Sequence, residues 1–287
     1  MKKLLAVVLA VCLLCLAGCG GTTGNNKTSI ADAKSLADLS GAKIAAQAGT
    51  FHEDALAQIN GAVTSTYPDF TDLLVALKSG AIDGYVAEEP TAYSVCASDD
   101  TLSYLALKNN DTGFTATAAD VGIAVALKTG SELRDQINAV LATITEEQKA
   151  TLMQQIVDLT AGKSVDKFVL ESEAPANPVG TLKVGMECAY EPFNWTDVEA
   201  SYGSVAISSE GGGYANGYDV QIAQYVANKL GMKLEVYAIE WDSLIPAVQS
   251  GAVDAVIAGM SPTAEREEEV DFTNTYYESN LVIIIKK

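Results

Sequence analysis

The polar loop between residues 259 and 266 carries the residue types best suited to bind a ligand. Ser261, Thr263 and Arg266 follow an apolar run, residues 255–258, whose composition is typical of a buried parallel strand. In open α/β sheets, ligands bind beyond the carboxyl ends of the strands. A guanidinium beside hydroxyl groups and free backbone N–H groups can hold a carboxylate through two parallel hydrogen bonds. The loop is therefore predicted to bind a carboxylate, and a solvated arginine among neighbouring glutamates is the alternative interpretation.

The strand that leads into this loop belongs to a pattern that occurs twice. Residues 76–87 and 247–258 share six of twelve positions, and each copy contains a helix end, a Ser-Gly pair and a strand that follows an aspartate. Glycine suits a left-handed helix terminus, and aspartate suits the turn before a strand. The first copy continues into Glu88, where the second continues into the loop of Arg266. Two such units that face each other would offer an acidic group and a cation, which together complement a small zwitterion.

A helix start near residue 50 is a further candidate contact. A strand is predicted to end at Gly49-Thr50, and a helix to follow over residues 53–59. Free N–H groups at the start of a helix attract an anionic or acceptor group of a ligand. Gln47 and Phe51 flank this position, and core packing is the alternative role of Phe51.

The N-terminus has the features of a secretory leader. Two lysines precede an apolar run, residues 4–17, that is shorter than the roughly 20 residues of a membrane-spanning helix. The run ends in Leu16-Ala17-Gly18-Cys19, which looks like the lipobox of bacterial lipoproteins. That likeness implies a signal peptide over residues 1–18, lipidation of Cys19, a tether over residues 19–34, and an extracytoplasmic protein anchored to the membrane. An ordinary signal with an incidental cysteine is the alternative.

The composition argues against several other kinds of site. The 287 residues suffice for two domains, and the formal net charge of −19 disfavours binding to nucleic acid or to anionic lipid. The chain has one histidine, His52, and no clustered cysteines, so neither a metal site nor a cofactor is predicted. Beyond residue 19 the cysteines are Cys96 and Cys188, and no spacing supports a disulfide between them.

The rest of the chain is predicted to alternate between helices and strands, as in an α/β fold. Residues 163–180 form a polar segment with two prolines and are the best candidate for a linker. Residues 199–216 are rich in Ser and Gly and are interpreted as a solvent-exposed loop. Residues 218–230 have the apolar stripe of an amphipathic helix, and residues 281–285 are a β-branched run that is expected to pair in a sheet.

Together these features resemble the amino-acid-binding proteins of ABC transporters, the family 3 extracellular solute-binding proteins. The resemblance covers nearly the whole chain beyond the leader. It implies a two-lobe, periplasmic-binding-protein-like fold of type II, in which each lobe is a mixed sheet flanked by helices and a hinged cleft separates the lobes. The matching stretches are Leu182-Lys-Val-Gly185, Tyr190-Glu-Pro-Phe193, Asn216-Gly-Tyr-Asp-Val220, Trp241 with Leu244-Ile-Pro246, Gly259-Met-Ser-Pro-Thr-Ala-Glu-Arg266, Val270-Asp-Phe-Thr-Asn-Thr-Tyr-Tyr277, Gln47-Ala-Gly-Thr50 and Gly122-Ile-Ala124.

The order of the segments differs from that of the family, so the chain looks circularly permuted. In the family, the counterpart of residues 181–287 comes before the counterpart of residues 35–162. A dimer in which strand 281–287 pairs with a second chain is the competing arrangement to a monomer. The permuted order implies residues 35–119 as lobe 2, completed by strand 281–287; residues 122–162 as the C-terminal part of lobe 1; residues 163–180 as the permutation linker; and residues 181–279 as the main part of lobe 1.

The resemblance also implies roles for the candidate residues of the carboxylate site. Arg266 would bind the α-carboxylate of an amino acid. Ser261 and the backbone N–H groups of Thr263 and Thr50 would assist it.

Other residues are implied to bind the remaining groups of the ligand. Glu88 would bind the α-ammonium together with the Gly259 carbonyl, although family members often have aspartate at this position. Tyr190 and Trp241 would enclose the side chain, and Glu187 would pair with a basic or amide group. Core packing of the two aromatic residues and a solvated Glu187 are the alternatives. The predicted site is completed by Met260, Gln47 and Phe51.

These expectations lead to hinge closure around a free amino acid, without covalent chemistry. The lobe of Glu88 would close over a ligand docked on the lobe of Arg266, because the ligand touches both lobes only in the closed state. The closed form would deliver a polar or basic amino acid to an ABC transporter permease. A sensing module for the same ligands is one alternative. A dehydratase-type enzyme is another, with His52, Glu187 and Glu88 as acid–base candidates.

Overall fold

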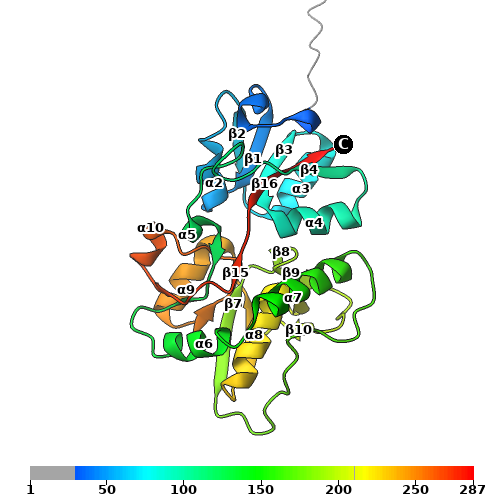
Figure 1. The fold of residues 1–287 in the computed structure, drawn as a ribbon. Helices are drawn as coiled ribbons and strands as arrows, with labels where there is room; N and C mark the ends of the chain where they lie inside the picture. Colours follow the sequence, from blue (N-terminus) through cyan, green and yellow to red (C-terminus); the bar gives the residue numbers. More distant parts are fainter. Residues whose placement is uncertain (1–29, 210) are drawn as a thin grey trace, which may run out of the picture.

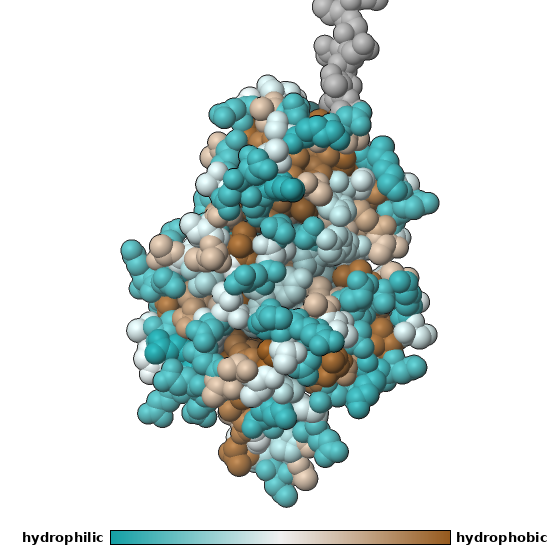
Figure 2. Space-filling model, in the orientation of Figure 1, coloured by the Kyte–Doolittle hydropathy of each residue, from teal (hydrophilic) through white to brown (hydrophobic). Residues whose placement is uncertain are grey.

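The computed structural model describes residues 30–209 and 211–287. Within them the chain forms two lobes, one above the other in Figure 1, and each is built on a five-stranded mixed sheet with helices beside it. Figure 2 shows hydrophilic residues over most of this face, in keeping with the formal net charge of −19. The predicted signal peptide, Cys19 and most of the predicted tether lie outside the described residues. Among the described helices, none is both long and apolar enough to cross a bilayer.

The sheet of lobe 2 has the strand order β2-β1-β3-β16-β4. β1 pairs in parallel with β2 and β3, whereas β16 is antiparallel to both β3 and β4. The strands are β1 (Lys43–Gln47), β2 (Val63–Tyr67), β3 (Gly84–Glu88), β4 (Leu102–Leu105) and β16 (Leu281–Lys286). The helical elements are η1 (Ile30–Asp32), η2 (Leu36–Leu39), α2 (Phe51–Leu56), α3 (Phe70–Ser79) and α4 (Glu89–Ser98).

The last strand, β16, suits the interior of this sheet because both of its faces are apolar. Ile283 belongs to one buried cluster and Ile284 to another, so successive β-branched side chains fill opposite faces. On the neighbouring strand, a Cβ at Gly84 would lie 2.8 Å from Cγ2 of Ile283. Glycine therefore permits the close pairing of β3 and β16, and the end of the chain lies in the lobe that contains Thr50.

The sheet of lobe 1 has the strand order β12-β7-β13-β6-β14. β7 is parallel to β12 and β13, and β6 is antiparallel to β13 and β14. The strands are β6 (Ala126–Leu127), β7 (Thr181–Met186), β12 (Lys233–Ala238), β13 (Ala255–Val256) and β14 (Asp271–Phe272). The helical elements are α6 (Leu133–Leu141), α7 (Glu146–Thr160), α8 (Tyr218–Lys229), η3 (Trp241–Ser243), α9 (Leu244–Ser250) and α10 (Ala264–Glu267).

A smaller antiparallel sheet corrects the interpretation of residues 199–216 as a solvent-exposed loop. This segment contributes two strands to the order β10-β11-β9-β8, and its last residue, Asn216, is fully buried. Ser- and Gly-rich composition concealed these short strands, which pair with each other and with residues 194–197 just before the segment. The strands are β8 (Ala189–Tyr190), β9 (Asn194–Asp197), β10 (Val205–Ala206) and β11 (Tyr214–Asn216).

The two copies of the repeated pattern adopt the same local structure. Helices α3 and α9 each end at a glycine with positive φ, 78° at Gly80 and 77° at Gly251. The aspartate that follows then accepts a hydrogen bond from the backbone N–H of a lysine on the neighbouring strand. The distance is 2.9 Å for Asp83 in lobe 2 and 2.8 Å for Asp254 in lobe 1. Each lobe therefore carries an equivalent helix–turn–strand unit that ends at the cleft.

Two segments that run between the lobes pair with each other. Helix α5 (Ala118–Val121) leads into β5 (Gly122–Ile123), which is antiparallel to β15 (Tyr277–Glu278). β15 then continues into β16 of lobe 2 (Figure 1). On another side of the cleft, α4 of lobe 2 packs against α7. These paired segments connect the two lobes.

Candidate functional site

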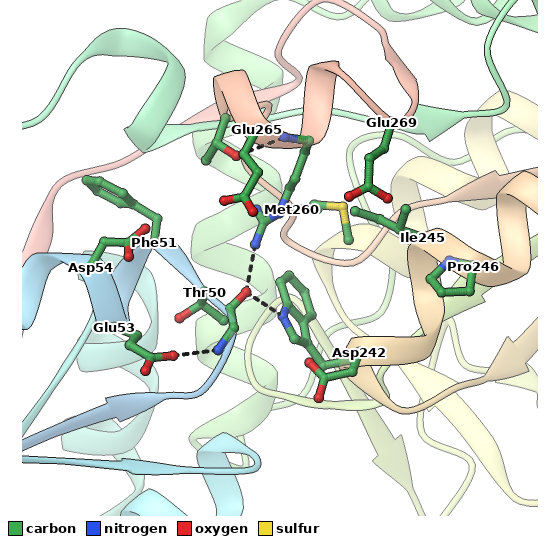
Figure 3. A pocket seen from close by; sticks show the side chains of 14 residues that line it. Thr50, Phe51, Glu53, Asp54, Asp242, Ile245, Pro246, Met260, Glu265 and Glu269 are labelled. Atoms are coloured by element: carbon green, nitrogen blue, oxygen red, sulfur yellow. Dashed lines mark hydrogen bonds between the residues drawn. The ribbon is translucent and has the colours of Figure 1, made fainter.

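Arg266 lies at the boundary between the lobes and contacts both. Its Nη1 donates to the Ser261 carbonyl (2.9 Å), and its Nη2 donates to the Gly49 carbonyl of lobe 2 (3.1 Å). The guanidinium carbon lies 5.2 Å from the ring centre of Trp241, whose Nε1 donates to the same Gly49 carbonyl at 3.1 Å (Figure 3). Burial lowers the pKa of Arg266, but a guanidinium remains protonated in proteins. The charge is therefore held in place by two carbonyls and one aromatic face.

Beside Arg266 lies a small cavity between the lobes, called here the inner cavity. It encloses about 10 Å³ of free space, room for about one water molecule. Nine of the twelve predicted ligand-binding residues line it, together with His52 and Phe70. These nine are Gln47, Thr50, Phe51, Glu88, Tyr190, Trp241, Gly259, Ser261 and Arg266.

Tyr190 meets an aromatic residue of the opposite lobe rather than Trp241. Its ring stacks on Phe70, with centroids 4.1 Å apart and an interplanar angle of 15°. Trp241 stacks on Arg266 instead. Sequence reasoning missed Phe70 because an apolar residue in the first turn of a helix looks the same whether it packs in a core or lines a cleft.

Gly259 has a backbone conformation that allows Tyr190 to approach. Its φ is 64°, in the left-handed region. A Cβ at this position would lie 2.9 Å from Cε1 of Tyr190. Glycine is therefore favoured here for both its dihedral angle and its missing side chain.

Glu187 and Gln47 form a hydrogen bond across the cleft. Nε2 of Gln47 donates to Oε1 of Glu187 at 2.6 Å and to the Pro68 carbonyl at 3.0 Å. Oε2 of Glu187 is buried and has no hydrogen-bond partner among the described residues. Burial raises the pKa of Glu187 to about 7; the hydrogen bond from Gln47 opposes this shift and the nearby Asp69 adds to it. Glu187 therefore places a carboxyl with an unused acceptor at the cleft.

Glu187 should make stability depend on pH near neutrality. Its folded-state pKa is raised, so its stabilising contribution is fully present below the unfolded pKa and is lost as the pH rises through about 7. Between pH 5 and 8 we expect the free energy of unfolding to fall by about 1–3 kcal/mol, and Glu187→Gln to remove part of that fall. Denaturant titrations at both pH values measure this, with the exposed Glu173→Gln as control. An unchanged fall in Glu187→Gln would contradict the assignment.

Glu88 has a partner within its own lobe. It ends β3 and is 4% exposed, and its Oε2 lies 2.9 Å from Nε2 of the similarly buried His52 on α2. Among the predicted site residues it is the acidic group that lines the inner cavity together with Arg266. The cavity thus contains a carboxylate and a guanidinium from opposite lobes.

The predicted hydroxyl residues hydrogen-bond to the backbone around the site. The Ser261 hydroxyl donates to the Asp120 carbonyl (2.9 Å), and the Thr50 hydroxyl donates to the Gln47 carbonyl (2.8 Å). Thr263 caps α10, since its Oγ1 accepts from the Arg266 N–H and its own N–H donates to the Ser261 carbonyl. These bonds fix the two loops that carry Gly49 and Arg266.

A larger pocket, the outer pocket, lies beyond Arg266 and Trp241 and is drawn in Figure 3. Its volume is about 350 Å³, and Met260 and Thr263, which do not line the inner cavity, are among its lining residues. Burial raises the pKa of Asp54, and neighbouring Glu53 adds to the shift. Such a concentration of carboxylates attracts cations. The acidic residues that line it are Glu53, Asp54, Asp242, Glu265 and Glu269.

A buried network that sequence reasoning missed supports the loops of the site. Asp219, fully buried in the first turn of α8, accepts hydrogen bonds from the Tyr276 hydroxyl (2.6 Å), from Nδ2 of Asn194 (2.8 Å) and from the Gly259 N–H. Oδ1 of Asn194 accepts from the Cys188 N–H at 2.8 Å. Burial raises the pKa of Asp219 to about 6. An aspartate in a first helical turn usually signals an exposed dipole partner, so its sequence position gave no hint of this role.

Two further observations concern the cysteines and the acidic side chains of residues 30–209 and 211–287. Cys96 and Cys188 are both free thiols. No group of three or more His, Cys, Asp or Glu side chains in this part of the chain is arranged to hold a metal ion.

Comparison with known proteins finds relatives over part of the chain. Residues 182–287 match the family described as bacterial extracellular solute-binding proteins, family 3. The arginine-binding extracellular protein ArtP of Bacillus subtilis is 36% identical over 106 residues, 37% of this chain and 36% of that protein. The L-cystine-binding protein TcyJ of Escherichia coli is 29% identical over 143 residues, 49% and 48% of the two chains. The chain thus spans less than half the length of these two curated relatives.

Similarity to solved structures is also partial. An ancestral arginine-binding protein bound to arginine is 39% identical and covers 33% of this chain and 36% of its own, with a TM-score of 0.27. The arginine-bound form of domain 1 from TmArgBP is 28% identical, and the match covers 38% of this chain and 81% of that one, with a TM-score of 0.30. On the sequence match, residues 182–287, which contain Tyr190, Trp241 and Arg266, are similar to the bacterial extracellular solute-binding proteins, family 3.

Proposed function

We propose that the protein binds a free amino acid between its lobes and delivers it to an ABC transporter permease. The observation that carries this proposal is the pair of opposite charges in the inner cavity, Arg266 from one lobe and Glu88 from the other. An amino acid presents a carboxylate and an ammonium close together, so one ligand can engage both lobes. Relatives named as arginine-, histidine- and cystine-binding proteins support the same conclusion.

Arg266 has donors to spare for a carboxylate. A guanidinium has five N–H groups, and the bonds to Ser261 and Gly49 use two of them. The remaining three suffice for a bidentate contact. Because the group is partly withdrawn from water, such a contact is stronger than it would be at an exposed arginine.

The lobes must separate to admit the ligand. The inner cavity has room for about one water molecule, and an amino acid needs several times that space. Contacts that span the cleft must break first, among them those of Arg266 and Trp241 with Gly49, of Tyr190 with Phe70, and of Glu187 with Gln47. Rotation about the paired strands β5 and β15 would open the cleft, and the ligand would then be enclosed as it closes.

The surroundings of the site favour a polar or basic side chain. Glu187 presents an unpaired acceptor oxygen where it meets Gln47 of the opposite lobe. The five acidic residues of the outer pocket add negative potential on the other side of Arg266. A cationic or amide side chain could donate a hydrogen bond to the Glu187 oxygen. A cationic side chain would also be attracted by the acidic residues of the outer pocket.

We also propose that the segments are circularly permuted, with the lobe boundaries given above. β16 completes the sheet of lobe 2, and η1 packs beside β16 and β4, so the two ends of the described chain lie close together (Figure 1). Residues 163–180 would then join the original ends between α7 and β7. Pairing of β16 within its own chain supports a monomer. Lipidation of Cys19 and anchoring in the membrane rest on the leader sequence.

A thermal-shift screen of the twenty common L-amino acids tests the function. At a concentration of a hundred times Kd, a ligand should stabilise the protein by about 2.7 kcal/mol and raise Tm by several degrees. The methyl ester and the N-acetyl derivative of the best ligand, which lack one charge each, should give almost no shift. Absence of a shift with all twenty would refute the proposal. Recovery of the amino acid unchanged after incubation is expected, and its conversion would favour the enzyme alternative.

A further inference from the structure

We propose that His52 is a pH-sensitive member of the ammonium site, which weakens amino-acid binding when it takes up a proton. This inference rests on the proposed function. It assigns to His52 a role in setting the charge that Glu88 presents to the ligand.

The geometry isolates the two side chains from solvent and from other partners. His52 is 6% exposed and Glu88 is 4% exposed, and their Nε2 and Oε2 atoms are 2.9 Å apart. Nδ1 of His52 has no hydrogen-bond partner among the described residues. The imidazole packs edge-on against Phe70, with centroids 5.6 Å apart. Both residues line the inner cavity, so the charge of the pair acts directly on a ligand there.

The charge of the imidazole determines the net charge that the His52–Glu88 pair presents to the ligand. A neutral imidazole beside Oε2 leaves the full negative charge on Glu88, which attracts an ammonium group. A protonated imidazole forms an ion pair of zero net charge with Glu88 and repels the ammonium. Imidazoles are the side chains that ordinarily change charge between pH 5 and 8. Affinity should therefore fall as the pH falls, and by linkage ligand binding should release a proton.

The effect of other titratable groups on the pH dependence of binding must be distinguished from the effect of His52. Glu187 is the main one, because burial raises its pKa to about 7 and a basic ligand would displace its proton as well. Arg266 keeps its charge throughout this range. Glu88, Tyr190 and Arg266 line the inner cavity with His52, and Glu53 and Asp54 follow it on α2. Asp69 precedes Phe70, which His52 contacts, and Glu187 bonds to Gln47 of the same cavity.

Calorimetric titrations at pH 5.5 and 7.5 test the inference, with whichever of the twenty amino acids gives the largest thermal shift as probe. The Glu187→Gln variant removes the competing carboxyl, and the double variant Glu187→Gln/His52→Gln also removes the imidazole but keeps an N–H donor. In Glu187→Gln we expect affinity to fall about tenfold at the lower pH, with proton release detected by comparing two buffers. In the double variant we expect less than a twofold change. Equal pH dependence in both would overturn the inference.

A second measurement requires no substitution. Because His52 is the single histidine, its ring proton signals in NMR spectra of untagged protein report its charge directly. A saturating amount of the probe should move the midpoint of that titration to lower pH, and an unmoved midpoint would overturn the inference. If wild type binds none of the twenty amino acids, the proposed function fails and this inference fails with it. If wild type binds but the midpoint stays fixed, only the role of His52 is refuted.

Discussion

Replacing Arg266 by alanine should weaken amino-acid binding by about a hundredfold or more. Hydrogen bonds to charged groups contribute about 1.5–3 kcal/mol each, and loss of a bidentate contact corresponds to roughly 3 kcal/mol, which is about two orders of magnitude in Kd. The substitution also removes the guanidinium from Trp241 and breaks the bond to the Gly49 carbonyl. Titration calorimetry with the best ligand of the thermal-shift screen measures the effect.

Two further variants show whether the charge or its geometry matters. Arg266→Lys keeps the positive charge but not the planar pair of donors, so an intermediate loss of about tenfold is expected. Arg134→Ala changes the chain's other arginine, which lies on α6 near Asp271 and is 42% exposed. That control should leave Kd within twofold of wild type. Equal affinity in Arg266→Ala and Arg134→Ala would mean that Arg266 does not hold the ligand carboxylate.

Replacing Asp219 by alanine should lower the free energy of unfolding by about 3 kcal/mol or more. The change leaves three buried donors without an acceptor and without water to replace it. They are the Tyr276 hydroxyl, the Asn194 amide and the Gly259 N–H. Because one of them belongs to Gly259 beside the inner cavity, protein that remains folded should also bind ligand more weakly. Urea titration gives the stability and calorimetry gives the affinity.

The variants around Asp219 separate its acceptor role from its size. Asp219→Asn keeps the volume but turns one acceptor oxygen into a donor, so it should be destabilising although nearly isosteric. Tyr276→Phe removes only one donor and should cost about 1 kcal/mol. Asp166→Ala, at an exposed position, serves as the control and should change stability by less than about 0.5 kcal/mol. A similar stability for Asp219→Ala and Asp166→Ala would show that the network does not support the fold.

The sequence was informative wherever residue type and short-range spacing are sufficient. The repeated Ser-Gly-Ala-x-Asp pattern predicts a helix end and a strand, because left-handed glycine and a turn aspartate act within a few residues. Both Gly80 and Gly251 have that left-handed φ. The β-branched run at residues 281–285 predicts a strand because its side chains leave no polar face, and it forms β16.

The candidate site could be predicted from the sequence for a related reason. Ligand groups in α/β proteins lie just beyond strand ends, so strand ends found in the sequence point to Gln47, Thr50 and Arg266. Nine of the twelve predicted residues line one cavity in the structure. Their chemical types, an arginine and a carboxylate, were visible without coordinates.

The three-dimensional arrangement was needed for every pairing between distant segments. Phe70 stacks on Tyr190, His52 meets Glu88, and Tyr276 bonds to Asp219. Each of these contacts depends on how two elements from different parts of the chain are packed together. Periodicity along one segment carries no information about that packing, because the same apolar or acidic residue fits a core, a surface or a cleft. Residue types thus identified the groups that can bind a zwitterion, whereas the fold selected their neighbours, because burial and distance are properties of the packed chain.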